Sequence, residues 1–310
     1  MHASLMNAGR YAATALVFTM AMAQAHAAPA TKETVRKYFD VTKASSLTDN
    51  VVETISAMQA KERKEETNPK EKAKKKAMYD QTNKVIRKYV KWSALEPIAI
   101  ESYQKELDEA DVQGMIVHAQ SPAGQIITNK MTPAIIKQLP AVGKHLEQRI
   151  ETLSAQKAGA KTPAPVPPAP PANPKEAMAR TLLSEMPGAR EEFAAMTASM
   201  EARMIQNVNM VMGEGGSSGM EPEMKRIAKL FKEQVTFDEI VALKARMLAS
   251  DLSEADMSAV IEDNKKPARR AQLIKAKKAE AAMQARMNTY LQETIMPVMV
   301  PELMKTLGKK

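Results

Sequence analysis

The chain lacks cysteine altogether, and aromatic residues make up only 4% of its 310 residues. Because no disulfide can form, the fold must be stabilised by burial of apolar side chains alone. The scarcity of aromatics and the 24 methionines favour a helical core built from Ile, Leu, Val, Ala and Met. Strand patterns are also scarce, since no alternation of apolar and polar residues is sustained between turn residues. The sequence therefore predicts an all-α fold.

Long apolar runs are missing except near the N-terminus. Residues 1–30 contain one charged residue, Arg10, followed by an apolar run that ends at about Ala23 and by an Ala-His-Ala sequence that ends at Ala27. This pattern is typical of an export signal, and the run is shorter than the roughly 20 residues of a membrane-spanning helix. We expect a signal peptide over residues 1–27 and a mature protein that is periplasmic or otherwise exported, with no transmembrane segment.

Groups that could carry out catalysis are scarce in the mature sequence. Only His118 and His145 follow the signal, and without cysteine the usual zinc sites, built from several His or Cys ligands, cannot form within one chain. The carboxylates Glu109 and Asp111 could serve as an acid and a base, but a helix cap explains them more simply. We therefore expect no catalytic residues, no metal and no cofactor, and we keep an enzyme of unknown type as a further alternative.

Proline is concentrated in one segment, residues 155–175, which holds seven prolines and no bulky apolar residue except Val166. A segment of this composition cannot pack a core and is expected to form an extended spacer. It divides the chain into two predicted helical-bundle domains, residues 31–154 and 176–306. The two domains are expected to move somewhat independently.

The two predicted domains share a repeated phrase. LDEAD, residues 107–111, returns as LSEAD at residues 252–256, an offset of 145 residues. The same offset, without a gap, pairs further positions: Trp92 with Phe237, Tyr103 with Leu248, Ile116 with Ile261, and Pro122-Ala123 with Pro267-Ala268. The sequence therefore predicts two divergent copies of one domain, that is, an internal repeat.

Each copy of the phrase has the features of a helix start. Its second residue is a suitable N-cap, its fifth residue is the acid of a capping box, and the leucine before the cap can form a hydrophobic staple. A proline ends each helix, and in the first copy Ser-Pro-Ala-Gly predicts a tight corner into a second helix. The motif residues are Leu107, Asp108, Asp111, Ser121, Pro122 and Gly124 in the first copy, and Leu252, Ser253, Asp256 and Pro267 in the second.

The motif of the first copy resembles a known family. Trp92, then Tyr103-x3-Leu107-Asp108-x2-Asp111-Val112, then Ser121-Pro122-x-Gly124 is similar to the signature of the bacterial secreted family catalogued as domain of unknown function 2059. The resemblance covers about residues 45–130, and residues 190–290 more weakly. Because the second copy has Lys266-Pro267-Ala268-Arg269 in place of Ser-Pro-x-Gly, a binding site at this corner would be lost there. The resemblance implies an all-helical exported domain and no established activity.

Basic residues are concentrated in the second copy, in a stretch of fourteen residues without an acid. The formal net charge is +9, or +8 without Arg10 of the signal. In an exported protein such a cluster is a candidate contact for anionic lipid headgroups, surface polysaccharide or acidic proteins rather than for nucleic acid, and a solvated helix face is the simpler alternative. The candidate contact residues are Lys265, Lys266, Arg269, Arg270, Lys275, Lys277 and Lys278.

Methionines are spaced for one helix face at Met196, Met200 and Met204. Thioether sulfurs can bind Cu(I), although such a stripe more often packs a core or lines an adaptable apolar groove. We therefore expect a non-catalytic interaction module of the cell envelope that binds an envelope protein or an anionic envelope surface. A Met-rich periplasmic copper-binding protein is the alternative.

Overall fold

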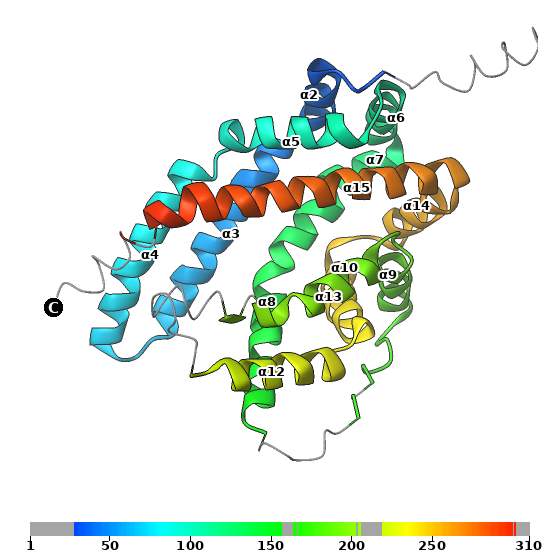
Figure 1. The fold of residues 1–310 in the computed structure, drawn as a ribbon. Coiled ribbons are helices and arrows are strands. Elements are labelled where there is room, and N and C mark those ends of the chain that lie inside the picture. Colours follow the sequence, from blue (N-terminus) through cyan, green and yellow to red (C-terminus); the bar gives the residue numbers. More distant parts are fainter. Residues whose placement is uncertain are drawn as a thin grey trace, which may run out of the picture.

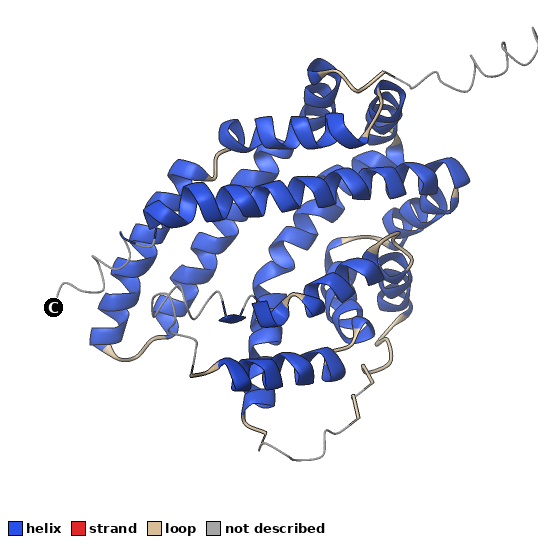
Figure 2. Cartoon of the chain, viewed as in Figure 1, coloured by secondary structure: helices blue, strands red, loops and turns tan. Residues whose placement is uncertain are grey.

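The computed structural model describes residues 28–156, 164–165, 167–202, 204–205, 219–299 and 301. These residues are almost entirely helical, and they form no strand apart from one isolated bridge between Pro29 and Asp108 (Figures 1 and 2). The all-α prediction is confirmed. None of the described helices is long and apolar enough to cross a membrane. The signal peptide predicted at residues 1–27 and part of the Pro-rich segment lie outside the described residues.

The helices of the two halves follow one another as shown in Figure 1. Those of the first half are α2 (Lys32–Val41), α3 (Ala44–Glu65), α4 (Pro69–Tyr89), α5 (Trp92–Glu106), α6 (Glu109–Gln120), α7 (Pro122–Ile126), the π-helical turn η1 (Ile127–Met131) and α8 (Thr132–Ser154). Those of the second half are α9 (Pro174–Ser184), α10 (Ala189–Ala198), α12 (Glu221–Gln234), α13 (Phe237–Asp251), α14 (Glu254–Lys265), α15 (Pro267–Tyr290) and η2 (Leu291–Ile295). The bounds of α5 and α6 differ from those of α13 and α14 by the same 145 residues.

Two helices, α6 and α14, begin at a capping box. The Asp108 carboxylate accepts a hydrogen bond of 2.7 Å from the Asp111 amide, and the Asp111 carboxylate accepts one from the Asp108 amide. Ser253 and Asp256 make the same two bonds at the start of α14. Both boxes supply partners to first-turn amides that have no acceptor within the helix. The local sequence therefore fixes where these two helices start.

The corner between α6 and α7 depends on a glycine. Ser121 caps α7 by accepting from the Gly124 amide at 3.2 Å. A Cβ atom at Gly124 would lie 2.0 Å from the carbonyl oxygen of His118, a distance that no side chain can tolerate. The Ser-Pro-x-Gly sequence thus allows α7 to approach the end of α6 closely. The equivalent position in the second half is Arg269.

The hydrophobic cores are shared between the two halves. One core cluster packs side chains of α2, α5 and α6 against Ala276 and Ala279 of α15. A second packs Met131 and Ala134 against side chains of α9, α13 and α14. A third joins Leu153 of α8 to α12. Positions 131 and 134 precede positions 276 and 279 by 145 residues, so each half extends the helix after its corner into the core of the other half.

This packing differs from the expectation of two separately packed domains that move somewhat independently. Figure 1 shows α15 running alongside α5 of the first half, and α8 passing close to the helices of the second half. The reason is physical: the apolar faces of α8 and α15 are covered by the opposite half, and moving the halves apart would expose both faces to water.

Ion pairs between the halves are reciprocal. The Lys130 amine lies 2.8 Å from the Asp256 carboxylate, and the Lys275 amine lies 2.5 Å from the Asp111 carboxylate. Subtracting 130 from 275 and 111 from 256 gives 145 in both cases. Contacts in which i touches j and the equivalent of j touches the equivalent of i are those of two like units related by a two-fold axis.

A residue and its equivalent meet at the centre of this arrangement. His118 Nε2 lies 2.7 Å from Asp263 Oδ2, and these two positions are themselves 145 residues apart. Equivalent positions of two like units come into contact only close to the axis that relates them. The approximate axis therefore passes near the contact between α6 and α14.

Candidate functional site

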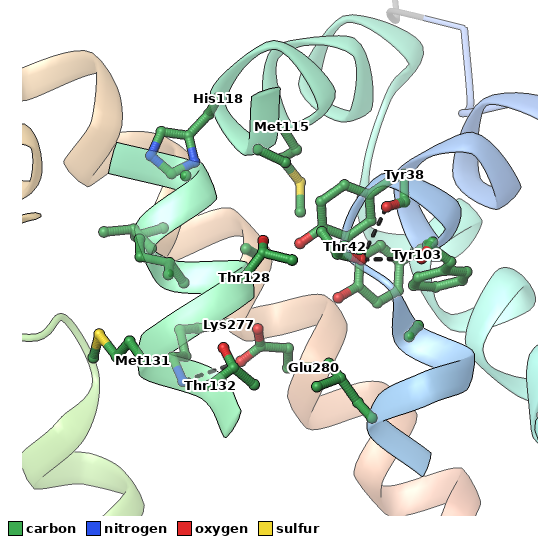
Figure 3. Close-up of a pocket in the computed structure, with 18 of the residues that line it drawn as sticks. Tyr38, Thr42, Tyr103, Met115, His118, Thr128, Met131, Thr132, Lys277 and Glu280 are labelled. Atoms are coloured by element: carbon green, nitrogen blue, oxygen red, sulfur yellow. Dashed lines mark hydrogen bonds and ion pairs between the residues drawn. The ribbon is translucent and has the colours of Figure 1, made fainter. Parts of the chain in front are cut away.

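A cavity of about 480 Å³ lies between the two halves, beside the first core cluster. Its walls come from α2, α3, α5, α6, η1, α14 and α15, so neither half forms it alone. Figure 3 shows side chains converging on it from distant parts of the chain, among them Tyr38 of α2, Thr128 of η1 and Lys277 of α15. Cavities of a few hundred Å³ are typical of sites for small molecules.

Most of the cavity lining is apolar. The Phe39 ring packs edge-on against Trp92 and Tyr103, with ring centroids 5.2 and 5.0 Å apart. Methionine side chains are flexible and polarizable, and they adapt to partners of different shapes. The lining includes five of them: Met115, Met131, Met186, Met283 and Met287. This part of the cavity suits an apolar group.

Two tyrosine hydroxyls are buried in the lining. The rings of Tyr38 and Tyr103 lie 5.8 Å apart, and their hydroxyls share a hydrogen bond. Burial raises the pKa of Tyr38 to about 12, and the nearby Glu280 carboxylate adds to the effect. Burial also raises the pKa of Tyr103 well above its usual value. Both hydroxyls are therefore protonated at neutral pH and can act as donors or acceptors.

Three basic side chains surround one carboxylate at the edge of the cavity. Asp263 accepts from Lys266 at 2.9 Å and from His118 at 2.7 Å, and it lies 3.8 Å from Arg269 Nε. Burial favours a higher pKa for Asp263, but the hydrogen bonds from Lys266 and His118 outweigh it, so the pKa is lowered. Burial lowers the pKa of His118, and the Arg269 charge adds to this effect. At neutral pH an uncharged imidazole therefore donates to an ionised carboxylate.

A second charged group in the lining is already neutralised. The Lys277 amine lies 3.0 Å from the Glu280 carboxylate, as Figure 3 shows, and 2.5 Å from that of Glu192. Burial acts to lower the pKa of Lys277, but the two carboxylates outweigh it and raise the pKa. The ammonium group is therefore charged and matched by two acids of its own chain.

The predicted cluster of basic residues is brought only partly to the cavity. Arg269 and Lys277 line the cavity, whereas the other five residues are exposed. Arg270 and Lys278 form no ion pair with the described residues. The exposed lysines that are paired within the chain are Lys265 with Glu262, Lys266 with Asp263, and Lys275 with Asp111.

The capped corner of the first half binds the segment before α2. The Ala30 amide donates to the Leu107 carbonyl at 3.2 Å. The Glu109 carboxylate accepts from the Thr34 hydroxyl, and this bond is the main reason why the pKa of Glu109 falls to about 2. Asp111 is paired with a lysine of α15. The two carboxylates considered as an acid and a base are thus held in contacts that join elements of the fold.

The methionine stripe is part of the packing of the second half. Met196 and Met200 pack against the core cluster that includes Leu153 and Phe231. Met204 lies in a helical residue pair beyond them. Within the described ranges, no group of three His, Asp or Glu residues could hold a metal ion.

No protein-family model matches this sequence, and neither a curated protein nor a solved structure matches it. The sequence analysis did not identify the cavity, because its lining comes from helices of both halves. One local signal could have indicated it. At the position where the first corner requires Gly124, the second copy has Arg269, so a long charged side chain must find another place. In the structure that place is the edge of the cavity.

Proposed function

We propose that the protein is an exported, non-catalytic binding protein whose ligand occupies the cavity between the two halves. The observation that carries this proposal is the cavity itself, which measures about 480 Å³ and combines an apolar and aromatic lining with a few polar groups. Small-molecule sites usually have this size and composition, and they often lie between structural units. The export-signal pattern at residues 1–27 supports a location outside the cytoplasm.

The proposal includes a duplicated architecture, in which residues 31–154 and 176–306 are two copies of one unit joined by the segment 155–175. The copies exchange the helices that follow their corners. Support comes from the offset of 145 residues, which recurs in the capping boxes, in the reciprocal ion pairs and in the core positions of α15 and η1–α8. Membership of the secreted helical family named above rests on the motif residues of the first copy.

The cavity is a better candidate for the binding site than the basic cluster. An anionic surface would have to compete with the carboxylates that already hold Lys265, Lys266 and Lys275. Exposed ion pairs contribute little to stability, but they reduce the net charge that an approaching surface meets. The copper alternative gains no support either, because Met196 and Met200 pack against core residues.

Filling the cavity tests the proposal. Ala276 is buried and lines the cavity, whereas Ala271 is exposed on the same helix. We expect the unaltered protein to bind an environment-sensitive naphthalene sulfonate dye with a stoichiometry of about one per chain. Ala276→Leu should abolish this binding, and the matched control Ala271→Leu should leave it unchanged. Equal binding by the two variants, with circular dichroism showing both folded, would contradict the proposal.

A further inference from the structure

We propose that the ligand of the cavity is an amphipathic anion, whose carboxylate or phosphate head binds at Arg269 and whose apolar body lies among the methionine and aromatic side chains. This inference rests on the proposed function, since it assigns a chemical class to the ligand of the same cavity. Two observations carry it: unpaired polar atoms in the lining, and an excess of positive charge at one end.

Two buried polar atoms in the lining have no hydrogen-bond partner among the described residues. They are Arg269 Nε, a donor, and Asn264 Oδ1, an acceptor. The Arg269 side chain is only 13% exposed, and its Nε is 3.8 Å from Asp263, which is too far for a hydrogen bond. Buried polar groups are nearly always hydrogen-bonded, because an unpaired one has lost its hydration without replacement. A ligand that accepts from Arg269 and donates to Asn264 would satisfy both atoms.

Positive charge exceeds negative charge at this end of the cavity. Lys266 and Arg269 face the single carboxylate of Asp263, and His118 adds no charge because burial keeps it neutral. Two cations against one carboxylate leave one positive charge. In addition, α15 begins at Lys266 without a side-chain cap or a first-turn acid, so the positive end of its dipole adds to the potential. The Lys277 cation is matched by two carboxylates and attracts an anion less.

The chemistry of the two unpaired atoms limits the head group. The guanidinium of Arg269 is planar and suits the oxygens of a carboxylate or a phosphate, with which it forms charge-assisted hydrogen bonds. Asn264 Oδ1 needs a donor, so the head carries a hydroxyl or an N–H beside the anion. The body meets methionines, which adapt to its shape. The cavity therefore selects the head group more strongly than the form of the apolar body.

Trp92 provides a direct readout of binding, because it is the only tryptophan of the chain and it lines the cavity. The purified protein would be titrated with dodecanoate, β-hydroxydodecanoate, dodecyl phosphate and the neutral dodecanol, with Trp92 emission followed throughout. We expect the anions to bind at least about 10-fold more tightly than dodecanol. We also expect the β-hydroxy acid to bind more tightly than dodecanoate, because its hydroxyl can donate to Asn264.

Variants of the head-group site sharpen the test. Arg269→Gln should weaken binding of the three anions by about 10- to 100-fold and leave dodecanol binding unchanged. Arg270→Gln is the matched control, since Arg270 is the exposed neighbour on the same helix, and it should change none of the four affinities. Asn264→Ala should remove the preference for the β-hydroxy acid.

The outcomes separate the two proposals. If dodecanol binds as tightly as the anions, or if none of the four amphiphiles binds while the naphthalene sulfonate dye still does, the anionic head is wrong and the cavity remains a binding site. If neither dye nor amphiphile binds, the proposed function fails. Tighter binding of dodecyl phosphate would identify a phospholipid source, and tighter binding of dodecanoate a free fatty acid. Should Arg269→Gln not fold, the comparison of anions with dodecanol in the unaltered protein decides.

Discussion

At the residue scale, two equivalent positions have opposite roles in the two corners. Gly124 lets α7 approach the His118 carbonyl, and no side chain would fit there. The second corner has Arg269 instead, so the same close approach is impossible, and the side chain extends to the edge of the cavity. A substitution that removes a packing glycine from one copy thus adds a charged group to the candidate site. Divergence between the two halves would in this way create an asymmetric site in a nearly symmetric frame.

The close approach at Gly124 gives a prediction with a matched control. Gly124→Ala should lower the free energy of unfolding by about 1–3 kcal/mol, because the added methyl group meets backbone atoms that cannot move aside. Gly143 is exposed within α8, and a Cβ there meets nothing within 4 Å. Gly143→Ala should therefore raise the free energy of unfolding by about 0.5–1 kcal/mol. Urea denaturation measures both, and two effects of the same sign would contradict the explanation.

At the element scale, helix starts follow from local sequence, whereas helix partners do not. Asp108 and Ser253 fix the starts of α6 and α14 through bonds that span three residues, so the sequence contains the whole motif. Ala276 and Ala279 carry no comparable signal, because a small buried residue fits against many helices. The sequence therefore predicts the helices and their corners, but not that α8 and α15 each pack in the opposite half.

The candidate site was hidden from the sequence for a related reason. Its lining residues, such as Phe39, Trp92 and Met283, belong to the same residue types that fill a core without leaving space. Whether they close completely depends on side-chain shapes at a junction of several helices, and no short pattern specifies that. The polar groups of the site are likewise assembled only by the exchange of α15.

The docking of η1 on the second half can be followed through one carboxylate. Hydrogen bonds from Lys130, and then from Ser253, lower the pKa of Asp256 to about 2. We expect Lys130→Gln to raise this pKa towards its ordinary value near 3.9, as measured by NMR titration of the Asp256 carboxyl group. Lys144→Gln, an exposed change on α8, is the control and should leave the pKa unchanged.

The sign of the accompanying effect on stability follows from linkage. A lowered carboxylate pKa stabilises the folded state above the unfolded pKa, about 3.9, and this contribution is lost as the pH falls through the folded pKa of about 2. Lys130→Gln should therefore reduce the free energy of unfolding at neutral pH and have little effect near pH 2. A variant equally destabilised at both values would show that Lys130 acts through packing instead.

At the scale of the whole molecule, each half lacks a core helix until the other supplies it. Ala276 and Ala279 cover the apolar faces of α2, α5 and α6, and Met131 and Ala134 cover those of α9, α13 and α14. The reciprocal ion pairs then fix the relative position of the halves at two equivalent points. Folding of one half should therefore depend on the other, much as in two subunits that exchange an arm.

Separating the halves tests this dependence. Residues 28–156 and 164–310 would be produced as two chains, and we expect each alone to show reduced helicity and no cooperative thermal transition, because a large apolar face is left uncovered. Mixing the two should restore the helicity and give a one-to-one complex on size-exclusion chromatography, with a melting temperature that rises with concentration. A single fragment that melts cooperatively at full helicity would mean that the shared clusters are not needed for folding. The cavity offers a second readout, since its walls come from both chains and only the complex should bind the dye.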